Sequence, residues 1–396
     1  MSTLKTTNIT HASNTGTANM VLASDGSVTF AGGSSTDSVP HRNLIINGSM
    51  QVAQRGTTAV AETGYKSVDR WQLSYAGHDE ALNQQQVDVS VGSSPYNLPV
   101  GSGHPYAHGF RKCFQVQNGN QTSGAGAGDF AQIVYKPEGQ DINRSGWNYT
   151  DPNSKLTLSF WVKSSVAQNF YGFIEAGSPT RIFGFETGTL VAHTWTKVTA
   201  VIPGYASLVI PDTTAAAFSL AIIPFYGTNY THASNRPVGT WYEAYNYFPD
   251  MASTWWTTND ATFQFTGVQL ELGDTGTTFE HRSFDDELGR CQRYFQSSYK
   301  YGNAVGSNTD WTNSFNVVSW ADGNAAGIQF RKHMRASPTV TLRRGDSNGT
   351  GEVLSGGQEK SATAQNIGTG GFQYINITSG VASTYVNLSW VAESEL

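Results

Sequence analysis

One stretch of the sequence, residues 263–272, alternates apolar and polar side chains in the way that is typical of a half-buried β-strand. Its apolar residues form two sets of opposite parity, first Phe263 and Phe265 and then Val268, Leu270 and Leu272. The parity changes at Gly267, where one extra residue in a β-bulge would keep both sets facing one core. The stretch is therefore predicted to be the last strand of a β-sandwich. A second domain is predicted to begin after Ser283.

Several more segments between residues 41 and 283 show strand-like alternation. In the clearest of them, residues 156–163, the even-numbered apolar side chains are predicted to face the core and the odd-numbered ones to face away. The other predicted strands lie at 43–48, 68–73, 111–116, 130–135, 170–174, 195–202 and 218–222. Eight or more strands of this length suit a jelly roll, an all-β sandwich that hides most of its edges.

Residues 1–40 are predicted to form an extended N-terminal arm rather than a domain. Polar residues surround one hairpin signal, in which residues 20–23 and 27–30 flank the turn Ser24-Asp25-Gly26. Two strands alone are not stable in water. The arm is therefore expected to pack on its own body, on a sister chain or on a larger particle.

A short helix over residues 284–296 is predicted to join the first sandwich to a second, smaller one. Ser283 can cap this helix, and the acidic residues that follow it suit the positive end of the helix dipole. The residues at helical spacing that should face a core are Leu288, Cys291 and Phe295. Later candidate strands lie at 315–320, 327–330, 339–342, 372–377 and 385–391. The predicted domains are 1–40, 41–283 and 284–396.

The composition narrows the class of protein. Charged residues make up 14% of the chain, and the net charge is −6 with no long Lys/Arg run, so nucleic-acid binding through a basic stripe is not expected. No apolar run approaches the ~18 residues of a membrane span, so no membrane insertion is expected. The N-terminus lacks a signal-peptide pattern, which predicts synthesis and folding in the cytoplasm. Cys113 and Cys291 are expected to be reduced, buried thiols.

Familiar catalytic motifs are missing from the sequence. It contains no nucleophile elbow, no His-Glu-x-x-His and no phosphate loop. A glycosidase needs two carboxylates in one cleft, and the spacing of the acids does not pair any two of them. His104 and His108 are four residues apart, but Pro105 between them breaks helical geometry. The sequence therefore predicts no catalytic residue, no metal site and no cofactor.

An aromatic-rich insertion, from Tyr226 to Trp256, interrupts the last two strands of the predicted sandwich. At about thirty residues it is longer than a simple connection. Its candidate binding residues are Tyr226, Tyr230, Trp241, Tyr242, Tyr245, Tyr247, Trp255 and Trp256. Aromatic faces beside Asn, Asp and Glu suit sugars. The same rings could instead pack against the sandwich or a sister subunit.

Two pieces of the sequence resemble known proteins. Residues 43–56, together with Asp69-Arg70-Trp71, resemble the opening of tailed-bacteriophage tail-fibre and virion-surface proteins, and residues 268–273, 279–284 and 291–296 are similar to their domain junction. The layout between them is similar to a jelly-roll carbohydrate-binding module. The resemblance implies a structural protein of the virion, a homo-oligomer for which a trimer is favoured, docked to other virion proteins through residues 1–40.

Three functions are compatible with this reading. The first is a tail fibre or spike whose sandwich loops touch a host-surface glycan. The second is an architectural capsid or tail decoration protein that locks neighbouring subunits and binds no receptor. The third is a tailspike that degrades polysaccharide, which would need a carboxylate pair about 5–10 Å apart in one groove.

Overall fold

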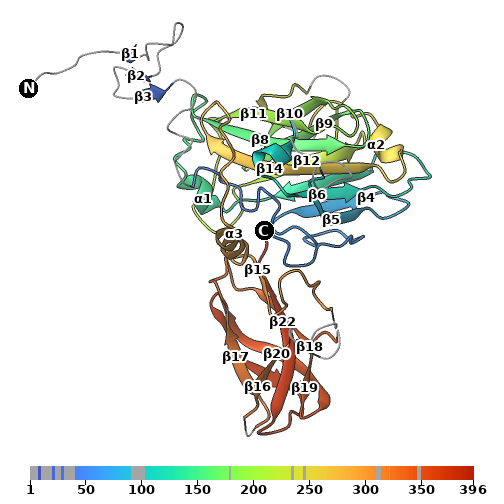
Figure 1. The fold of residues 1–396 in the computed structure, drawn as a ribbon, viewed down its shortest axis with the longest axis vertical. Coiled ribbons are helices and arrows are strands. Elements are labelled where there is room, and N and C mark those ends of the chain that lie inside the picture. Colours follow the sequence, from blue (N-terminus) through green and yellow to red (C-terminus); the bar gives the residue numbers. More distant parts are fainter. Residues whose placement is uncertain are drawn as a thin grey trace, which may run out of the picture.

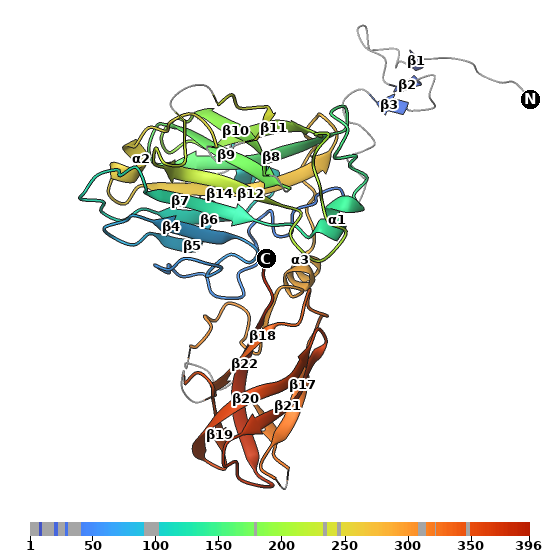
Figure 2. The same cartoon turned by 180° about the vertical axis from the view of Figure 1, so that it is seen from behind.

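The structure is a computed structural model that describes residues 41–90, 103–177, 180–232, 236–243, 247–307, 314–320, 322–345 and 349–396. It also places three short strands of the arm, β1 (Asn8–Ile9), β2 (Met20–Leu22) and β3 (Val28–Phe30). β2 and β3 pair antiparallel, which confirms the predicted hairpin, and β1 adds a third strand beside β2. The described body consists of two β domains placed end to end (Figure 1 and Figure 2).

The first domain is a sandwich of two antiparallel sheets. One sheet has the order β13-β10-β9-β12-β7-β4, and the other has the order β11-β8-β14-β6-β5. The strands of the first sheet are β4 (Gln72–Ala76), β7 (Phe130–Tyr135), β9 (Asn169–Ala176), β10 (Arg181–Thr189), β12 (Phe218–Tyr226) and β13 (Trp241–Tyr242). Those of the second are β5 (Asn83–Asp88), β6 (Lys112–Gln117), β8 (Lys155–Ser164), β11 (Thr196–Pro203) and β14 (Thr262–Leu272). This all-β, jelly-roll architecture agrees with the fold class predicted from the sequence.

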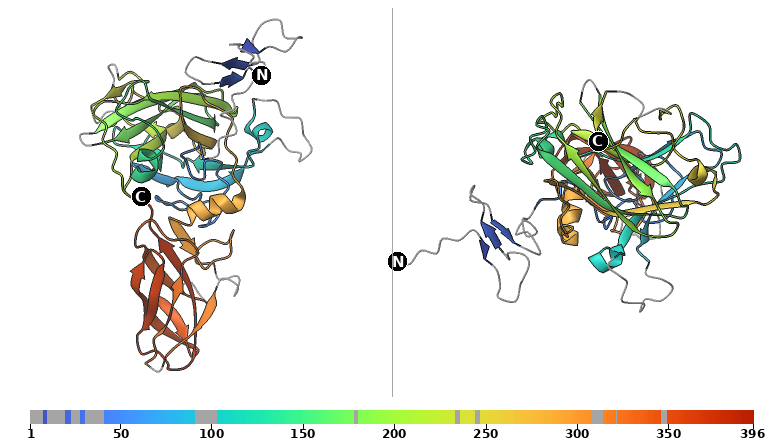
Figure 3. Two further views of the ribbon diagram at one scale, coloured as in Figure 1. Left: turned by 90° about the vertical axis from the view of Figure 1, so that its left-hand side faces the viewer. Right: turned by 90° about the horizontal axis from the view of Figure 1, so that it is seen from above.

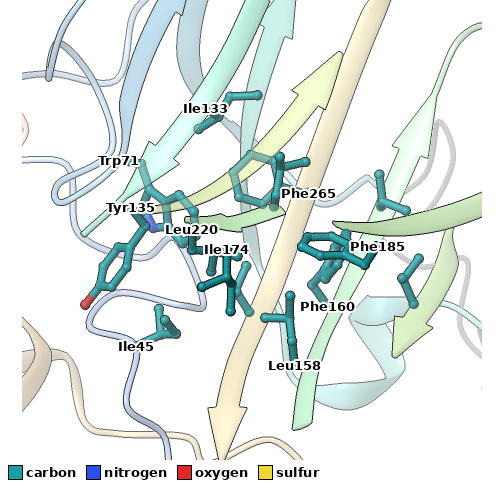
Figure 4. Close-up of a cluster of buried hydrophobic side chains, with 14 of the residues drawn as sticks. Ile45, Trp71, Ile133, Tyr135, Leu158, Phe160, Ile174, Phe185, Leu220 and Phe265 are labelled. Atoms are coloured by element: carbon teal, nitrogen blue, oxygen red, sulfur yellow. The ribbon is translucent and has the colours of Figure 1, made fainter. Parts of the chain in front are cut away.

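Side-chain alternation builds the core between the two sheets. All four even-numbered apolar residues of β8 are fully buried there, as the sequence predicts, and they meet inward residues of the opposite sheet such as Ile174 and Leu220 (Figure 4). Each large apolar side chain buried in this way contributes about 1.5–3 kcal/mol. Two short helices, α1 (Gly139–Asn143) and α2 (Thr254–Thr257), lie at opposite ends of the sandwich (Figure 1). A third, η2 (Pro105–His108), packs on the outward face of the five-stranded sheet, where the His108 ring lies 5.3 Å from that of Trp161 on β8.

β14 carries the predicted change of parity. Its register against β8 shifts between Thr266 and Gln269, and Gly267 has a φ of +66°. Phe265 before the shift and Val268 after it are both fully buried in the core, which confirms the bulge. Leu272, which was expected to face the core, is 42% exposed because it is the last residue of the strand.

The opening segment, residues 43–48, was predicted to be a strand, and this prediction is wrong. Its backbone is irregular, and the side chain of Asn43 holds it against the bulge by donating to the Val268 carbonyl at 3.2 Å and accepting from the Leu270 N–H at 3.1 Å. A Cβ on Gly48 would lie 2.1 Å from the Val268 carbonyl oxygen. The segment is therefore shaped by close contact with β14 and not by strand pairing.

The C-terminal domain is a second β unit built around one long central strand. Its strands are β15 (Phe295–Ser297), β16 (Phe315–Val318), β17 (Ala325–Gln329), β18 (Thr339–Arg344), β19 (Glu352–Ser355), β20 (Gln358–Gly368), β21 (Gly371–Ile377) and β22 (Tyr385–Glu393). β22 pairs with β15, β16, β18 and β19, and a separate core that includes Phe372, Leu388 and Trp390 fills the domain.

The helix between the domains, α3 (Phe284–Cys291), is shorter than predicted. Ser283 caps it as expected, because its hydroxyl accepts the Asp286 N–H at 3.2 Å. The helix ends at Cys291, and Phe295, which was expected to lie on it, begins β15. In the side view of Figure 3, α3 lies between the sandwich and the C-terminal domain.

Buried charges join the two domains. The Arg70 guanidinium is ion-paired with Glu395 and lies over the Tyr294 ring at 3.5 Å, and Arg55 pairs with the same Glu395 carboxylate at 3.2 Å. Nearby, the Glu138 carboxylate accepts hydrogen bonds from two guanidinium nitrogens of Arg293, at 2.6 and 2.8 Å. Paired charges of this kind hold a fixed arrangement, because breaking a buried pair is costly.

Asp69 makes this joint sensitive to pH. Burial raises the pKa of its carboxyl to about 6 from an ordinary 3.8, although Arg55 lowers that pKa. The folded chain therefore binds a proton on Asp69 that the unfolded chain does not bind between these values. The contribution of this proton to the stability of the folded chain is fully present below pH 3.8 and is lost as the pH rises through about 6.

We expect the unfolding free energy of the wild type, relative to Asp69→Asn, to rise by up to about 3 kcal/mol as the pH falls from about 7 to about 4. Urea unfolding of both proteins over this range measures the difference. Asp88→Asn is the control, because it removes a carboxylate from an exposed ion pair with Lys112 and keeps Asp69. The difference in unfolding free energy between the wild type and this control should not follow the Asp69 slope. A wild-type-to-variant difference that does not change with pH would contradict this expectation.

Candidate functional site

The outward face of the six-stranded sheet carries the most distinctive group of side chains. Along β7 and β9, residues that face the core alternate with residues that point outward. The outward residues include Phe130, Gln132, Phe173 and Glu175. Because β7 and β9 both pair with β12, residues far apart in the sequence come together on this face.

Part of this face is covered by residues 227–232, 236–243 and 247–251, which we call the covering segment. Phe248 is fully buried and stacks on Tyr171 with ring centroids 4.8 Å apart, and Tyr247 stacks on Phe173 at 4.3 Å. The strands beneath are apolar here, and stacking of the segment on them removes that surface from water. The covering segment thus leaves part of the face open and forms a wall beside it.

A groove of about 320 Å³ remains beside this wall. Its lining combines six aromatic or aliphatic residues of the wall and floor with polar residues from four strands and with Lys136, which directly follows β7. The lining residues are Gln72, Ser74, Phe130, Gln132, Val134, Lys136, Phe173, Glu175, Ser219, Tyr226, Tyr230 and Tyr247. We call this the tyrosine groove.

Hydrogen bonds fix the tyrosines of the groove. The Tyr226 hydroxyl donates to the Gln132 side-chain carbonyl at 2.5 Å, and the Tyr247 hydroxyl donates to a Glu175 carboxylate oxygen at 3.3 Å. Tyr226 and Tyr230 have ring centroids 5.1 Å apart. Burial, and for Tyr247 also the charge of Glu175, raises the pKa of the Tyr226 and Tyr247 phenols well above the ordinary value, so both stay neutral.

The eight aromatic residues predicted from the sequence to bind a ligand lie in different parts of the structure. Tyr226, Tyr230 and Tyr247 line the tyrosine groove, and Tyr226 is itself buried at its base. Tyr242 is half-buried on β13, where the Arg236 guanidinium lies 5.1 Å from its ring. Tyr245 lies outside the described residues.

The three tryptophans belong to the core, which corrects their selection as ligand contacts. Trp255 and Trp256 on α2 have no exposed surface, and Trp256 stacks on Phe225 at 5.1 Å. Trp241 is 8% exposed, and its indole N–H donates to the Pro203 carbonyl at 2.7 Å. A ring without accessible faces cannot stack on a sugar, so these three side chains stabilise the end and edge of the sandwich.

The polar floor of the groove was not predicted from the sequence. Gln72 follows the predicted strand residue Trp71, and Gln132 is an outward position of the predicted strand 130–135. Their outward parity was visible in the sequence. Their meeting with Lys136 and Glu175 depends on the order β9-β12-β7-β4, for which local sequence carries no signal.

Other candidate chemistry is limited in the part of the chain that the structure describes. His104 caps η2 by accepting the Tyr106 N–H, and no group of three or more His, Cys, Asp or Glu side chains is arranged to hold a metal ion among the described residues. Both cysteines are buried and free, as predicted, and burial raises the pKa of both thiols. None of the helices described is long and apolar enough to cross a membrane.

His281 and Arg282 follow the last strand of the first sandwich, and each contacts a different segment. The His281 ring bonds to the His108 carbonyl at 2.8 Å within the first domain. Arg282 donates to the Ile45 carbonyl at 3.0 Å and lies 3.6 Å from Glu287 on α3. It therefore ties the opening segment to α3, whereas the joint to the C-terminal domain uses other residues.

No protein-family model matches the sequence, and no curated protein matches it. Among solved structures, the chain is similar to the enzymatically active domain of tailspike protein 4 of bacteriophage CBA120, at 12% identity and a TM-score of 0.31 over 59% of this chain and 22% of that one. It is also similar to a family 11 carbohydrate-binding module of a Clostridium thermocellum cellulase, at 12% identity and a TM-score of 0.24 over 57% and 99% of the two chains.

A xylan-binding domain from Paenibacillus barcinonensis is similar at 10% identity and a TM-score of 0.25, over 57% of this chain and all of that one, 100%. The chain thus spans 22% of the tailspike and nearly the whole of the two binding modules. At these TM-scores the similarities carry no argument about what this chain binds or does.

Proposed function

We propose that this chain is a non-enzymatic structural protein of a tailed bacteriophage, a tail fibre or spike, that binds a neutral host-surface glycan in the tyrosine groove. The observation that carries the binding proposal is the groove itself, where tyrosine rings and side-chain amides line one hollow. The assignment to a virion comes from the resemblance of residues 43–56 with Asp69-Arg70-Trp71, and of residues 268–273, 279–284 and 291–296.

The groove has the chemistry that a sugar requires. A pyranose ring presents flat C–H faces and a rim of hydroxyls, which suits aromatic walls combined with a few fixed polar groups. Tyr230 is half-buried and supplies a ring that remains partly accessible. Gln72, Gln132 and Ser74 supply uncharged donors and acceptors on the floor.

Binding without hydrolysis fits the acids of the groove better than catalysis does. Glu175 is the one carboxylate among the described residues that line it, and its neighbour Tyr247 donates a hydrogen bond to it. Glycoside hydrolysis generally needs two carboxyl groups across the scissile bond. We therefore propose that the groove holds its glycan and leaves it intact.

The remaining parts of the proposal concern assembly in the virion. We propose that residues 1–40 dock the chain to other virion proteins and that the body forms a homotrimer. A three-stranded arm leaves strand edges that need partners, and closed symmetry is the common solution. Mass measurement of the assembled protein tests the oligomer, and a stable monomer in solution would overturn that part.

We expect Tyr230→Ala to weaken glycan binding by about tenfold, because the accessible wall of the groove is lost, which corresponds to about 1.4 kcal/mol. Gln132→Ala should have a comparable effect, since it removes a floor amide and frees the Tyr226 hydroxyl. A glycan-array screen identifies the ligand for the wild type, and titration of that glycan compares the variants.

Tyr385→Ala is the matched control, because that ring is 72% exposed on the C-terminal domain and lies outside the groove. It should bind the glycan like the wild type. If no glycan binds, or if Tyr230→Ala binds as well as the control, the groove is not the site. Protection of the groove tyrosines by subunit assembly would favour the decoration role instead, and release of shortened glycan would show a degrading tailspike.

A further inference from the structure

A second hollow lies between α3 and the C-terminal domain. It has a volume of about 800 Å³ and shares no lining residue with the tyrosine groove. One wall is α3, including Asp285, Asp286 and Arg290, and the other is the loop Arg331-Lys332-His333 between β17 and β18. We call it the interdomain cleft.

The charges of this cleft do not balance. Arg290 is paired with Asp286 at 3.2 Å. Arg293 is held by Glu138. Arg331, Lys332 and His333 are exposed, and none of the three takes part in an ion pair with any residue that the structure describes. In a chain of net charge −6, the neighbouring Arg331 and Lys332 side chains form a local positive field, and Asp285 is the one carboxylate of the cleft lining without an ion pair among the described residues.

The loop that carries the cations is held rigidly. The side-chain amide of Gln296, which is 1% exposed, accepts the Arg331 N–H at 2.9 Å and donates to the Lys332 carbonyl at 2.7 Å. The N–H groups of Phe330 and Met334 bond to carbonyls of the β20–β21 turn, at 2.9 and 2.8 Å. Because the backbone is fixed on both sides of the cations, little ordering is needed when a ligand binds.

We propose that the interdomain cleft binds a phosphate-bearing saccharide. A phosphate group carries close to two negative charges and three acceptor oxygens, which match Arg and Lys side chains that project from one short loop. The volume exceeds what a single phosphate fills and is in the range of small-molecule sites, so part of a sugar fits beside it. The inference uses residues separate from the tyrosine groove and does not depend on that site.

Calorimetric titration of the full chain at low ionic strength tests the proposal, with glucose 6-phosphate, inorganic phosphate and glucose as probes. We expect saturable binding of glucose 6-phosphate, weaker binding of inorganic phosphate and none of glucose. Arg331→Gln/Lys332→Gln should weaken glucose 6-phosphate binding at least about tenfold, since charge-assisted hydrogen bonds are lost. The Gln296 bonds involve only the backbone of these residues, so the fold is kept.

Lys66→Gln/Lys112→Gln removes two positive charges at other exposed ion pairs and serves as the matched control. It should bind the phosphosugar within about twofold of the wild type, because salt and water largely screen charges that lie away from the cleft. No saturable binding by the wild type, equal losses in both double variants, or binding of inorganic phosphate without the phosphosugar would each overturn the proposal. Tyr230→Ala should leave this binding unchanged, which separates it from the tyrosine groove.

Discussion

Replacing Arg70 by methionine is expected to lower the free energy of unfolding by about 3–5 kcal/mol. The Arg70 side chain is fully buried and its partner Glu395 is 5% exposed, so the substitution breaks a buried ion pair and leaves the Glu395 carboxylate with Arg55, at 3.2 Å, as its remaining cation. It also removes a donor to the Lys136 carbonyl at 2.6 Å and the contact with the Tyr294 ring. Urea unfolding followed by tryptophan fluorescence measures the loss.

Arg144→Met provides the comparison for this prediction. Arg144 is 68% exposed and pairs with Asp212 at 3.1 Å, so its removal should cost less than about 1 kcal/mol. Adding Glu395→Gln to Arg70→Met should recover part of the loss, because it neutralises a buried carboxylate that has kept only one of its two cations. If Arg70→Met and Arg144→Met unfold at the same urea concentration, the joint does not depend on this buried pair.

Gly267→Ala is expected to destabilise the first domain by about 4 kcal/mol. The backbone of Gly267 has a φ of +66°, which is strained for a residue with a side chain, and a Cβ would lie 2.6 Å from the ring of Phe110. Phe110 is 2% exposed and packs against Phe279 at 4.8 Å, so it has little room to move. Thermal and urea unfolding both report the change.

Gly188→Ala separates the two causes of this effect. Gly188 has a φ of +68°, close to that of Gly267, but nothing lies within 4 Å of the position of its Cβ. Only the backbone strain applies there, so a loss of about 1–2 kcal/mol is expected. Equal losses in the two variants would mean that the contact of the bulge with Phe110 is unimportant.

Hydrophobic alternation predicted much of the sandwich because most strands have one face in the core. It located β7 and β8 closely, and the glycine at the change of parity in β14 indicated the bulge. It failed for β5, where the side chains of Gln84 and Gln86 point inward and bond to backbone carbonyls of other segments. A strand that buries amides in this way has no apolar period to detect.

One missed hairpin did carry a local signal. β19 and β20 pair through Ser355 and Gln358, and Gly356 and Gly357 between them both have positive φ. A Gly-Gly pair between two strands is a recognised hairpin turn. The sequence around it, rich in Glu, Lys and Ser, lacks strong apolar alternation, and this explains the omission.

The candidate site was only partly predictable because composition does not reveal burial. Tyr230 and Trp255 belong to the same aromatic insertion, yet one lines a groove and the other fills the core. α2 turns Trp255 and Trp256 under the end of the sandwich, where Asn118 and Gln168 bond to their backbone. Such placement follows from tertiary packing, for which the residue types alone give no direction.

The covering segment has a consequence for how recognition could diversify. It forms one wall of the tyrosine groove, while the opposing sheet and the core beneath depend on residues elsewhere in the chain. Exchanging side chains such as Tyr230 would reshape the opening without disturbing the scaffold that makes the protein fold. On the function proposed above, changes confined to this one short insertion would alter which ligand the groove accepts and leave the rest of the fold as it is.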